Sequence, residues 1–94
     1  MKIFMMKIIL RATWVHSLKE KRMIVRSITQ KLKNTFNISV VEAEEQDKHQ
    51  IIVIGIAGIG ANIAQSDSIV ENIISFIEVN TDAEIINIEQ ECLN

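Results

Sequence analysis

The sequence predicts a single α+β domain over residues 1–94 in which the elements follow the order βαββαβ. Three observations support this prediction. Apolar residues alternate with other residues along the first fourteen positions, which is the period of a strand. Two later stretches repeat apolar residues at the helical period. The polar stretch EEQDKHQ (44–50) separates two further apolar segments, as the tip of a hairpin would.

The first strand is expected over residues 2–14. Every second residue from Phe4 to Trp14 is apolar, whereas the other face mixes apolar residues with Lys7 and Arg11. An antiparallel sheet with one buried face produces this contrast. Trp14 ends the apolar face, so we expect it in the core, and stacking against a nucleobase is the less favoured alternative.

The first helix is expected from residue 18 to about residue 34. With a turn of about 100° per residue, four apolar residues fall within a sector of about 80° and form a seam that should be buried. Ser17 precedes the helix and Glu20 follows three residues later, which is the spacing of a capping box. The seam consists of Leu18, Val25, Ile28 and Leu32.

Two strands are expected on either side of the polar stretch, over residues 37–45 and from residue 50 to about residue 61. The second of these strands is apolar on both faces. The glycines in GIAGIG (55–60) do not have the spacing of a nucleotide-binding loop, and they indicate a strand against which a helix packs closely. One face carries Ile52, Ile54 and Ile56, and the other carries Ile51, Val53, Ala57 and Ile59.

The second helix is expected to begin at Asp67, or at Ser68 with Glu71 as its capping partner. A last strand follows over residues 84–91. The inner stripe of the helix would be Ile69, Val70, Ile73, Ile74 and Ile77, and the shared face of the strand would carry Ile86 and Ile88.

This element order predicts a ferredoxin-like split βαβ sandwich, with a four-stranded antiparallel sheet and two helices on one face. The first and third strands become the central pair. The helices cover only one side of the sheet, so the other side would expose apolar residues, and monomers seldom leave a large apolar patch in water. We therefore expect a dimer or larger homo-oligomer. Its interface would include Ile3, Met5, Ile9, Ile51 and Val53.

Composition gives no indication of a disulfide, a cofactor or a membrane anchor. The chain has a single cysteine, Cys92, which fits a reducing compartment. Lys7 and Arg11 break the apolar stretch at the start of the chain, and no apolar run reaches the roughly 20 residues that a bilayer requires. We expect a cytoplasmic protein with no membrane contact, no metal site and no cofactor.

Charge is divided unequally along the chain. Residues 1–41 hold nine basic residues and one acid, and residues 42–94 hold one basic residue and eleven acids. Such asymmetry points to a nucleic-acid or acidic partner, unless the two halves neutralise each other in the fold. The candidate anion-binding residues are Lys19, Lys21, Arg22, Arg26 and Lys33.

Four of these cations fall within a sector of about 60° on the first helix. Lys21 instead falls among the apolar residues, so we expect its side chain to extend past the sheet edge and keep its charge in water. The alternative is a solvated helix face, or one paired with acids of the second helix. Both interpretations remain open at the level of the sequence.

Catalysis is not expected. His16 and His49 lie far apart in the sequence without neighbouring ligands, and Cys92 has no basic neighbour to activate it. Glu42, Glu44 and Glu45 alternate near a strand end, where a solvated hairpin rim is favoured over a metal site.

Three segments, HSLKEKR (16–22), NTFNISVVEAEEQD (34–47) and IGIA (54–57), resemble the YlxP-like family of bacterial proteins, whose function is unknown. The resemblance implies a ferredoxin-like fold. It also implies a role linked to translation, with ribosomal RNA or the ribosome as partner, because the family's genes often accompany genes for translation initiation and ribosome maturation. His49 stands where the family commonly has a tryptophan. The alternatives are a homo-oligomeric interaction module and a sensor of a small ligand held between subunits.

Overall fold

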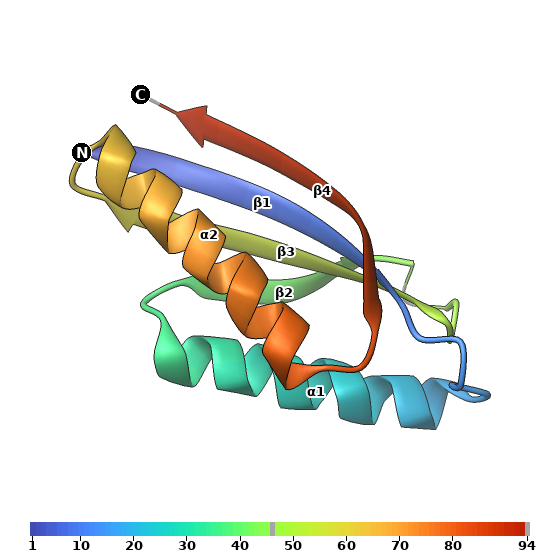
Figure 1. The fold of residues 1–94 in the computed structure, drawn as a ribbon. Coiled ribbons are helices and arrows are strands. Elements are labelled where there is room, and N and C mark those ends of the chain that lie inside the picture. Colours follow the sequence, from blue (N-terminus) through green and yellow to red (C-terminus); the bar gives the residue numbers. More distant parts are fainter. Residues whose placement is uncertain (46, 94) are drawn as a thin grey trace.

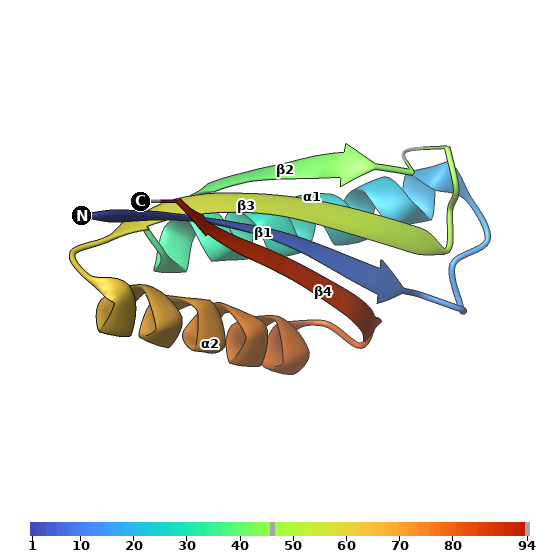
Figure 2. The same ribbon diagram turned by 90° about the horizontal axis from the view of Figure 1, so that it is seen from above.

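A computed structural model describes residues 1–45 and 47–93. Its strands form one antiparallel sheet in the order β2-β3-β1-β4, and both helices lie on one side of it (Figures 1 and 2). This confirms the α+β ferredoxin-like prediction, with the first and third strands in the centre. Gln46, in the expected hairpin tip, lies outside the described residues. The elements are β1 Lys2–Arg11, α1 Leu18–Thr35, β2 Ser39–Glu44, β3 Ile51–Gly60, α2 Ile63–Asn80 and β4 Glu84–Leu93.

The core lies between the sheet and the two helices. The central strands supply alternate apolar side chains, and the two helices cover them with their buried seams. Each of these side chains contributes roughly 1.5–3 kcal/mol to folding by leaving water. The strand residues are Phe4, Met6, Ile8, Leu10, Ile52, Ile54 and Ile56, and the helix residues are Val25, Ile28, Leu32, Val70, Ile73 and Ile77.

Both helices begin at a side-chain cap. The Ser17 hydroxyl accepts a hydrogen bond of 3.1 Å from the backbone N–H of Glu20, which confirms the predicted start of α1. The expected start of α2 at Asp67 or Ser68 is wrong. The Asn62 side chain caps this helix by accepting from the backbone N–H of Gln65 at 2.8 Å, and Asn62 precedes Asp67 by about one and a half helical turns.

Glycine in β3 permits a close approach of its neighbours, as the sequence indicated. A Cβ atom on Gly60 would lie 2.9 Å from the backbone nitrogen of Ser66 in α2. A Cβ atom on Gly58 would lie 2.8 Å from a ring carbon of Phe4. Real Cβ atoms do not approach other atoms so closely, so the start of α2 and the Phe4 ring both depend on these glycines.

The edge strand β4 contains a bulge that the sequence pattern did not indicate. Ile9 of β1 pairs with Asn87, and the next residue of β1, Leu10, pairs with Ile85, so Ile86 is the extra residue. A bulge changes the side of the sheet to which later residues point. The expectation that Ile86 and Ile88 share a face is therefore wrong: Ile85 and Ile88 pack against the core, and Ile86 is exposed.

Trp14 is also placed differently from the expectation. β1 ends at Arg11, and the chain then turns, with the Val15 N–H donating to the carbonyl oxygen of Ala12 at 3.2 Å. Ala12 and Val15 are fully buried, whereas Trp14 is 45% exposed. The prediction of Trp14 as a core residue is wrong because the strand alternation ends before it.

Candidate functional site

Four cations form an exposed stripe along α1. Lys19, Arg22, Arg26 and Lys33, which we call the basic stripe, are all exposed. Among the residues that the structure describes, no carboxylate lies within 4.0 Å of their charged nitrogens. The acids of α2 therefore do not neutralise the stripe, which removes one of the two alternatives to an anion-binding surface.

The basic stripe lies beside the buried seam of α1, on the flank opposite α2. With Leu18 as zero and about 100° per residue, the stripe occupies the sector from about 40° to 100°. Ile24 lies at about −120°, and it lines a groove with Asn80 at the end of α2. Figure 1 shows this end of α2 approaching the middle of α1. The stripe is thus left open to a partner along the length of the helix.

Lys21 does not belong to this surface, and the expectation that its charge reaches water is wrong. Lys21 is 1% exposed. Its Nζ donates to the carbonyl oxygens of Glu45 at 2.6 Å and Lys48 at 2.7 Å, and lies 3.0 Å from Oε2 of Glu42. The Lys21 ammonium group thus donates two hydrogen bonds to backbone carbonyls and forms an ion pair with the Glu42 carboxylate. Lys21 therefore attaches the segment between β2 and β3 to the start of α1.

The acceptor at Glu45 depends on an unusual backbone conformation. Glu45 has φ of +58°, in the left-handed region, which costs a residue with a Cβ roughly 1–2 kcal/mol. Its carbonyl oxygen also accepts from the Lys48 N–H at 3.1 Å, and its carboxylate lies 3.0 Å from Nζ of Lys48. These contacts offset the strain and direct the Glu45 carbonyl to Lys21.

The three glutamates near the end of β2 each face a lysine. Glu42 lies beside Lys21 at 3.0 Å, Glu45 beside Lys48 at 3.0 Å, and Glu44 beside Lys7 at 2.8 Å. Carboxylates paired in this way are not arranged around a common cation position. Within residues 1–45 and 47–93, the structure has no group of three or more metal-ligating side chains, and no helix is long and apolar enough to cross a membrane.

The sheet face opposite the helices carries an apolar patch at one end. Ile59, Ile3 and Leu93 lie side by side across β3, β1 and β4. Their exposed fractions are 60%, 38% and 42%, and Met5 and Val41 nearby reach 45% and 60%. We call these five residues the apolar sheet patch. Of the sequence-predicted interface residues, Ile3 and Met5 belong to it.

The other three predicted interface residues are less accessible. Ile9 and Ile51 are half-buried. Val53 is 1% exposed because it lies in the interior of the sheet, with Ile9 on one neighbouring strand and Glu44 on the other. The expectation of Val53 as a contact residue is therefore wrong. The alternation of apolar residues in the sequence did not identify Val41, which lies on an edge strand, or Leu93, which lies beyond the expected end of the last strand.

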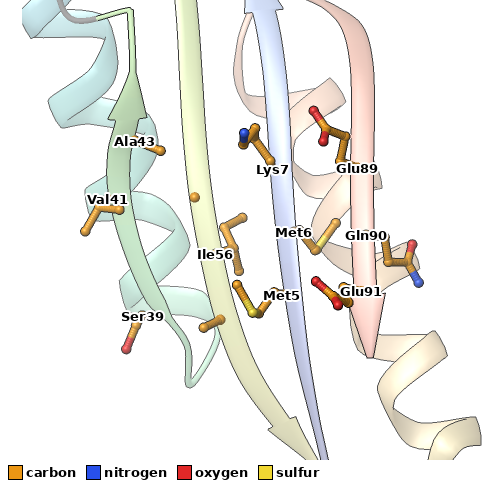
Figure 3. A pocket seen from close by; sticks show the side chains of 12 residues that line it. Met5, Met6, Lys7, Ser39, Val41, Ala43, Ile56, Glu89, Gln90 and Glu91 are labelled. Atoms are coloured by element: carbon orange, nitrogen blue, oxygen red, sulfur yellow. The ribbon is translucent and has the colours of Figure 1, made fainter. Parts of the chain in front are cut away.

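A shallow groove of about 580 Å³ continues from the apolar sheet patch across the open face (Figure 3). Gly55 and Ala57 of β3 contribute to its lining, together with Met5, Lys7 and Glu89 of the neighbouring strands. The hydrogen bond and charge of Glu44, with a smaller contribution from the charge of Glu89, raise the pKa of Lys7 above its ordinary value. This groove therefore combines an apolar lining with a cation and acids at its margins.

Comparison with known proteins shows what this chain is similar to. Residues 3–90 match the family described as "Protein of unknown function (DUF503)". The "Uncharacterized protein YlxP" of Bacillus subtilis (strain 168) is 34% identical over 62 residues, which cover 66% of this chain and 67% of that relative. These matches confirm the resemblance that the three sequence segments indicated. Two of those segments meet in space, since Lys21 comes from the first and Glu42 and Glu45 come from the second.

Proposed function

Since the chain belongs to the DUF503 family of proteins of unknown function, we propose a function from its own surface: it binds RNA through the basic stripe of α1. The partner would be ribosomal RNA or the ribosome, in the translation-linked role that the family resemblance implies. The observation that carries this proposal is the exposure of four aligned cations without acidic partners in the described residues. The role is one of binding, not of catalysis.

The position of these cations has a cost that a polyanion would remove. Lys19 lies in the first turn of α1, where the helix dipole disfavours positive charge by roughly 0.3–1 kcal/mol at low salt. Arg22 and Arg26 are four residues apart and repel each other by a few tenths of a kcal/mol. Phosphates beside the basic stripe would compensate both the unfavourable helix dipole and the repulsion between the two arginines. Such contacts position a nucleic-acid backbone without reading its sequence.

Salt dependence and charge reversal test this proposal directly. Four phosphate contacts predict that the logarithm of the affinity for purified ribosomal RNA falls with the logarithm of salt concentration with a slope of about −3. Lys19→Glu/Arg22→Glu should weaken binding strongly and make this slope shallower. Filter binding over a salt series measures both quantities.

Two lysines near the end of α1 provide a matched control. Lys33 belongs to the basic stripe, and Lys31 points to a different side of the same helix. Lys33→Glu should weaken RNA binding, whereas Lys31→Glu, with the same change in charge, should have a much smaller effect. Equal effects of the two variants would indicate a response to net charge alone and contradict a defined stripe.

A second candidate function is a homo-oligomeric module, in which the apolar sheet patch meets the same patch of a second copy. The exposure of five large apolar side chains on one face favours this candidate. A two-fold interface must be self-complementary. The open face carries cations, Lys7 and Arg11, and acids, Glu89 and Glu91, around the apolar residues, and opposite charges of two copies can pair across such an interface.

The oligomeric state separates this candidate from a monomer. Light scattering at micromolar concentration should give the mass of a dimer, and Ile59→Asp should convert it to a monomer. Val79 on α2 is 84% exposed, so Val79→Asp is the matched control and should leave the dimer intact. A monomeric unmodified protein would contradict the dimer. A monomer would also contradict the alternative of a small ligand held between subunits.

A further inference from the structure

We infer that a groove beside Trp14 holds one nucleobase of a single-stranded RNA whose phosphates lie on the basic stripe. This inference rests on the proposed function and adds the class of RNA and a stacking contact. The groove lies between the first half of α1 and the end of α2 and has a volume of about 290 Å³. Its lining includes Trp14, Met23, Ile24 and, from the α2 end, Asn80 and Asp82.

The side chains that line this groove expose apolar surface of the kind that stacks on a base. Trp14 is 45% exposed and Met23 is 64% exposed. An indole ring offers a flat π-face to any base, and a thioether makes favourable contacts with aromatic rings. Trp14 is the only tryptophan of the chain, and the chain has no tyrosine. The exposed Trp14 side chain thus lies near the basic stripe instead of in the core.

Met23 connects the groove to the basic stripe. It is four residues after Lys19 and three residues before Arg26, so its side chain is a neighbour of both on the helix surface. Around the helix, the stripe ends at about 100°, and Met23 follows at about 140°. A nucleotide whose phosphate contacts Lys19 or Arg26 would therefore extend its base over Met23 toward Trp14.

The charges at the groove fix which part of the nucleotide enters. Asp82 lies at the groove and disfavours a phosphate there, whereas its carboxylate can accept a hydrogen bond from an exocyclic amino group of a base. The cations lie on the other side of Met23 and attract the phosphates. These charges therefore favour a base in the groove and its phosphate on the basic stripe.

A duplex does not satisfy this arrangement. In A-form RNA the bases are stacked inside the helix, so their faces are not available to a tryptophan. Unpaired nucleotides in a loop, bulge or strand end can be splayed onto an aromatic side chain. The groove therefore favours single-stranded RNA over duplex RNA.

The fluorescence of Trp14 reports on this contact, because no other tryptophan contributes to the signal. Titration with a single-stranded oligocytidine should quench the fluorescence. A duplex RNA of similar length, or inorganic polyphosphate, should bind the basic stripe with little quenching. Trp14→Ala should weaken binding of the oligocytidine by about 5- to 150-fold. It should leave duplex and polyphosphate binding unchanged, as measured by anisotropy of labelled ligands.

Trp14→Phe guards against an effect of misfolding, since it keeps an aromatic face and should retain part of the affinity that Trp14→Ala loses. If Trp14→Ala binds single strands as tightly as the unmodified protein while charge reversal of the stripe abolishes binding, the base site is wrong and the proposed function stands. If neither single-stranded nor duplex RNA binds, both proposals fail. Equal losses for single-stranded and duplex RNA in Trp14→Ala would also overturn the base site.

Discussion

Lys21 and Arg22 are neighbours in the sequence, carry the same charge and belong to the first turns of the same helix. Lys21 is buried and faces three oxygen acceptors, whereas Arg22 is exposed with no carboxylate partner among the described residues. One cation stabilises the fold, and the other is available to a partner. A run of positive charge in a sequence can therefore combine a buried cation that is paired within the fold with an exposed cation that is not.

The difference extends beyond these two residues. On the hairpin side of α1, Lys21, Glu42, Glu45 and Lys48 form a group in which each charge lies beside an opposite charge. On the stripe, like charges lie next to one another. The first arrangement favours stability and the second accepts local repulsion, which is the pattern expected where a fold carries a binding surface.

Removal of the Lys21 charge should produce the largest loss of stability. Lys21→Met leaves the Glu42 carboxylate and two backbone carbonyls without their ammonium donor, and breaking a buried pair in this way costs roughly 3–5 kcal/mol. Urea denaturation measures this loss. Lys31→Met, at an exposed position of the same helix, should change the free energy of unfolding by less than about 0.5 kcal/mol. Equal stabilities of the two variants would contradict the structural role of Lys21.

The helix caps should give the next largest effect. Ser17→Ala removes the acceptor for the Glu20 N–H and should destabilise the protein by about 0.5–2 kcal/mol. Asn62→Ala makes the matched change in α2 and should cost a similar amount. Thermal unfolding followed by circular dichroism measures both. An unchanged melting temperature for Ser17→Ala would show that α1 begins elsewhere.

Charge reversal in the stripe should have a small effect on stability, in the opposite direction. Lys19→Glu/Arg22→Glu places an acid in the first turn, where the helix dipole favours it, so the free energy of unfolding should hold or rise, by at most about 0.3–1 kcal/mol. The same variant should lose RNA binding. A variant that unfolds would indicate that these side chains make internal or intersubunit ion pairs. A stabilised variant that binds RNA as before would show that the basic stripe is a solvated surface that does not contact RNA.

The smallest effect is expected for Lys7 on the open sheet face. Its pKa is raised above 10.5 by Glu44, so the folded state binds this proton more tightly than the unfolded state. The contribution of Lys7 to stability is fully present below pH 10.5 and is lost as the pH rises through the raised pKa. The free energies of unfolding of Lys7→Met and of the unmodified protein should therefore become equal at high pH. A difference between the two free energies of unfolding that persists above the raised pKa of Lys7 would contradict this contribution of the ion pair.

The sequence by itself determined the order of the elements, the buried seam of α1 and the cap at Ser17. These features depend on interactions between residues a few positions apart, so periodicity and spacing are sufficient to predict them. The alternation of apolar residues along the strand predicted which residues of β3 face the helices. The basic stripe was also predictable, because a helix fixes the relative directions of its own side chains.

Only the tertiary structure decided the roles of Lys21, Trp14 and Ile86. The acceptors of Lys21 lie 24 and 27 residues away along the chain, where no local pattern connects them to it. Ile86 is displaced by a bulge in its pairing with β1, and Trp14 is exposed because the chain turns after Arg11. Asn62 begins α2 although Asp67 was also a suitable cap, and Gly60, which has no Cβ, leaves room for Ser66 of that helix. In each case a contact between distant segments outweighed a local preference, because burial and satisfied hydrogen bonds depend on the whole fold.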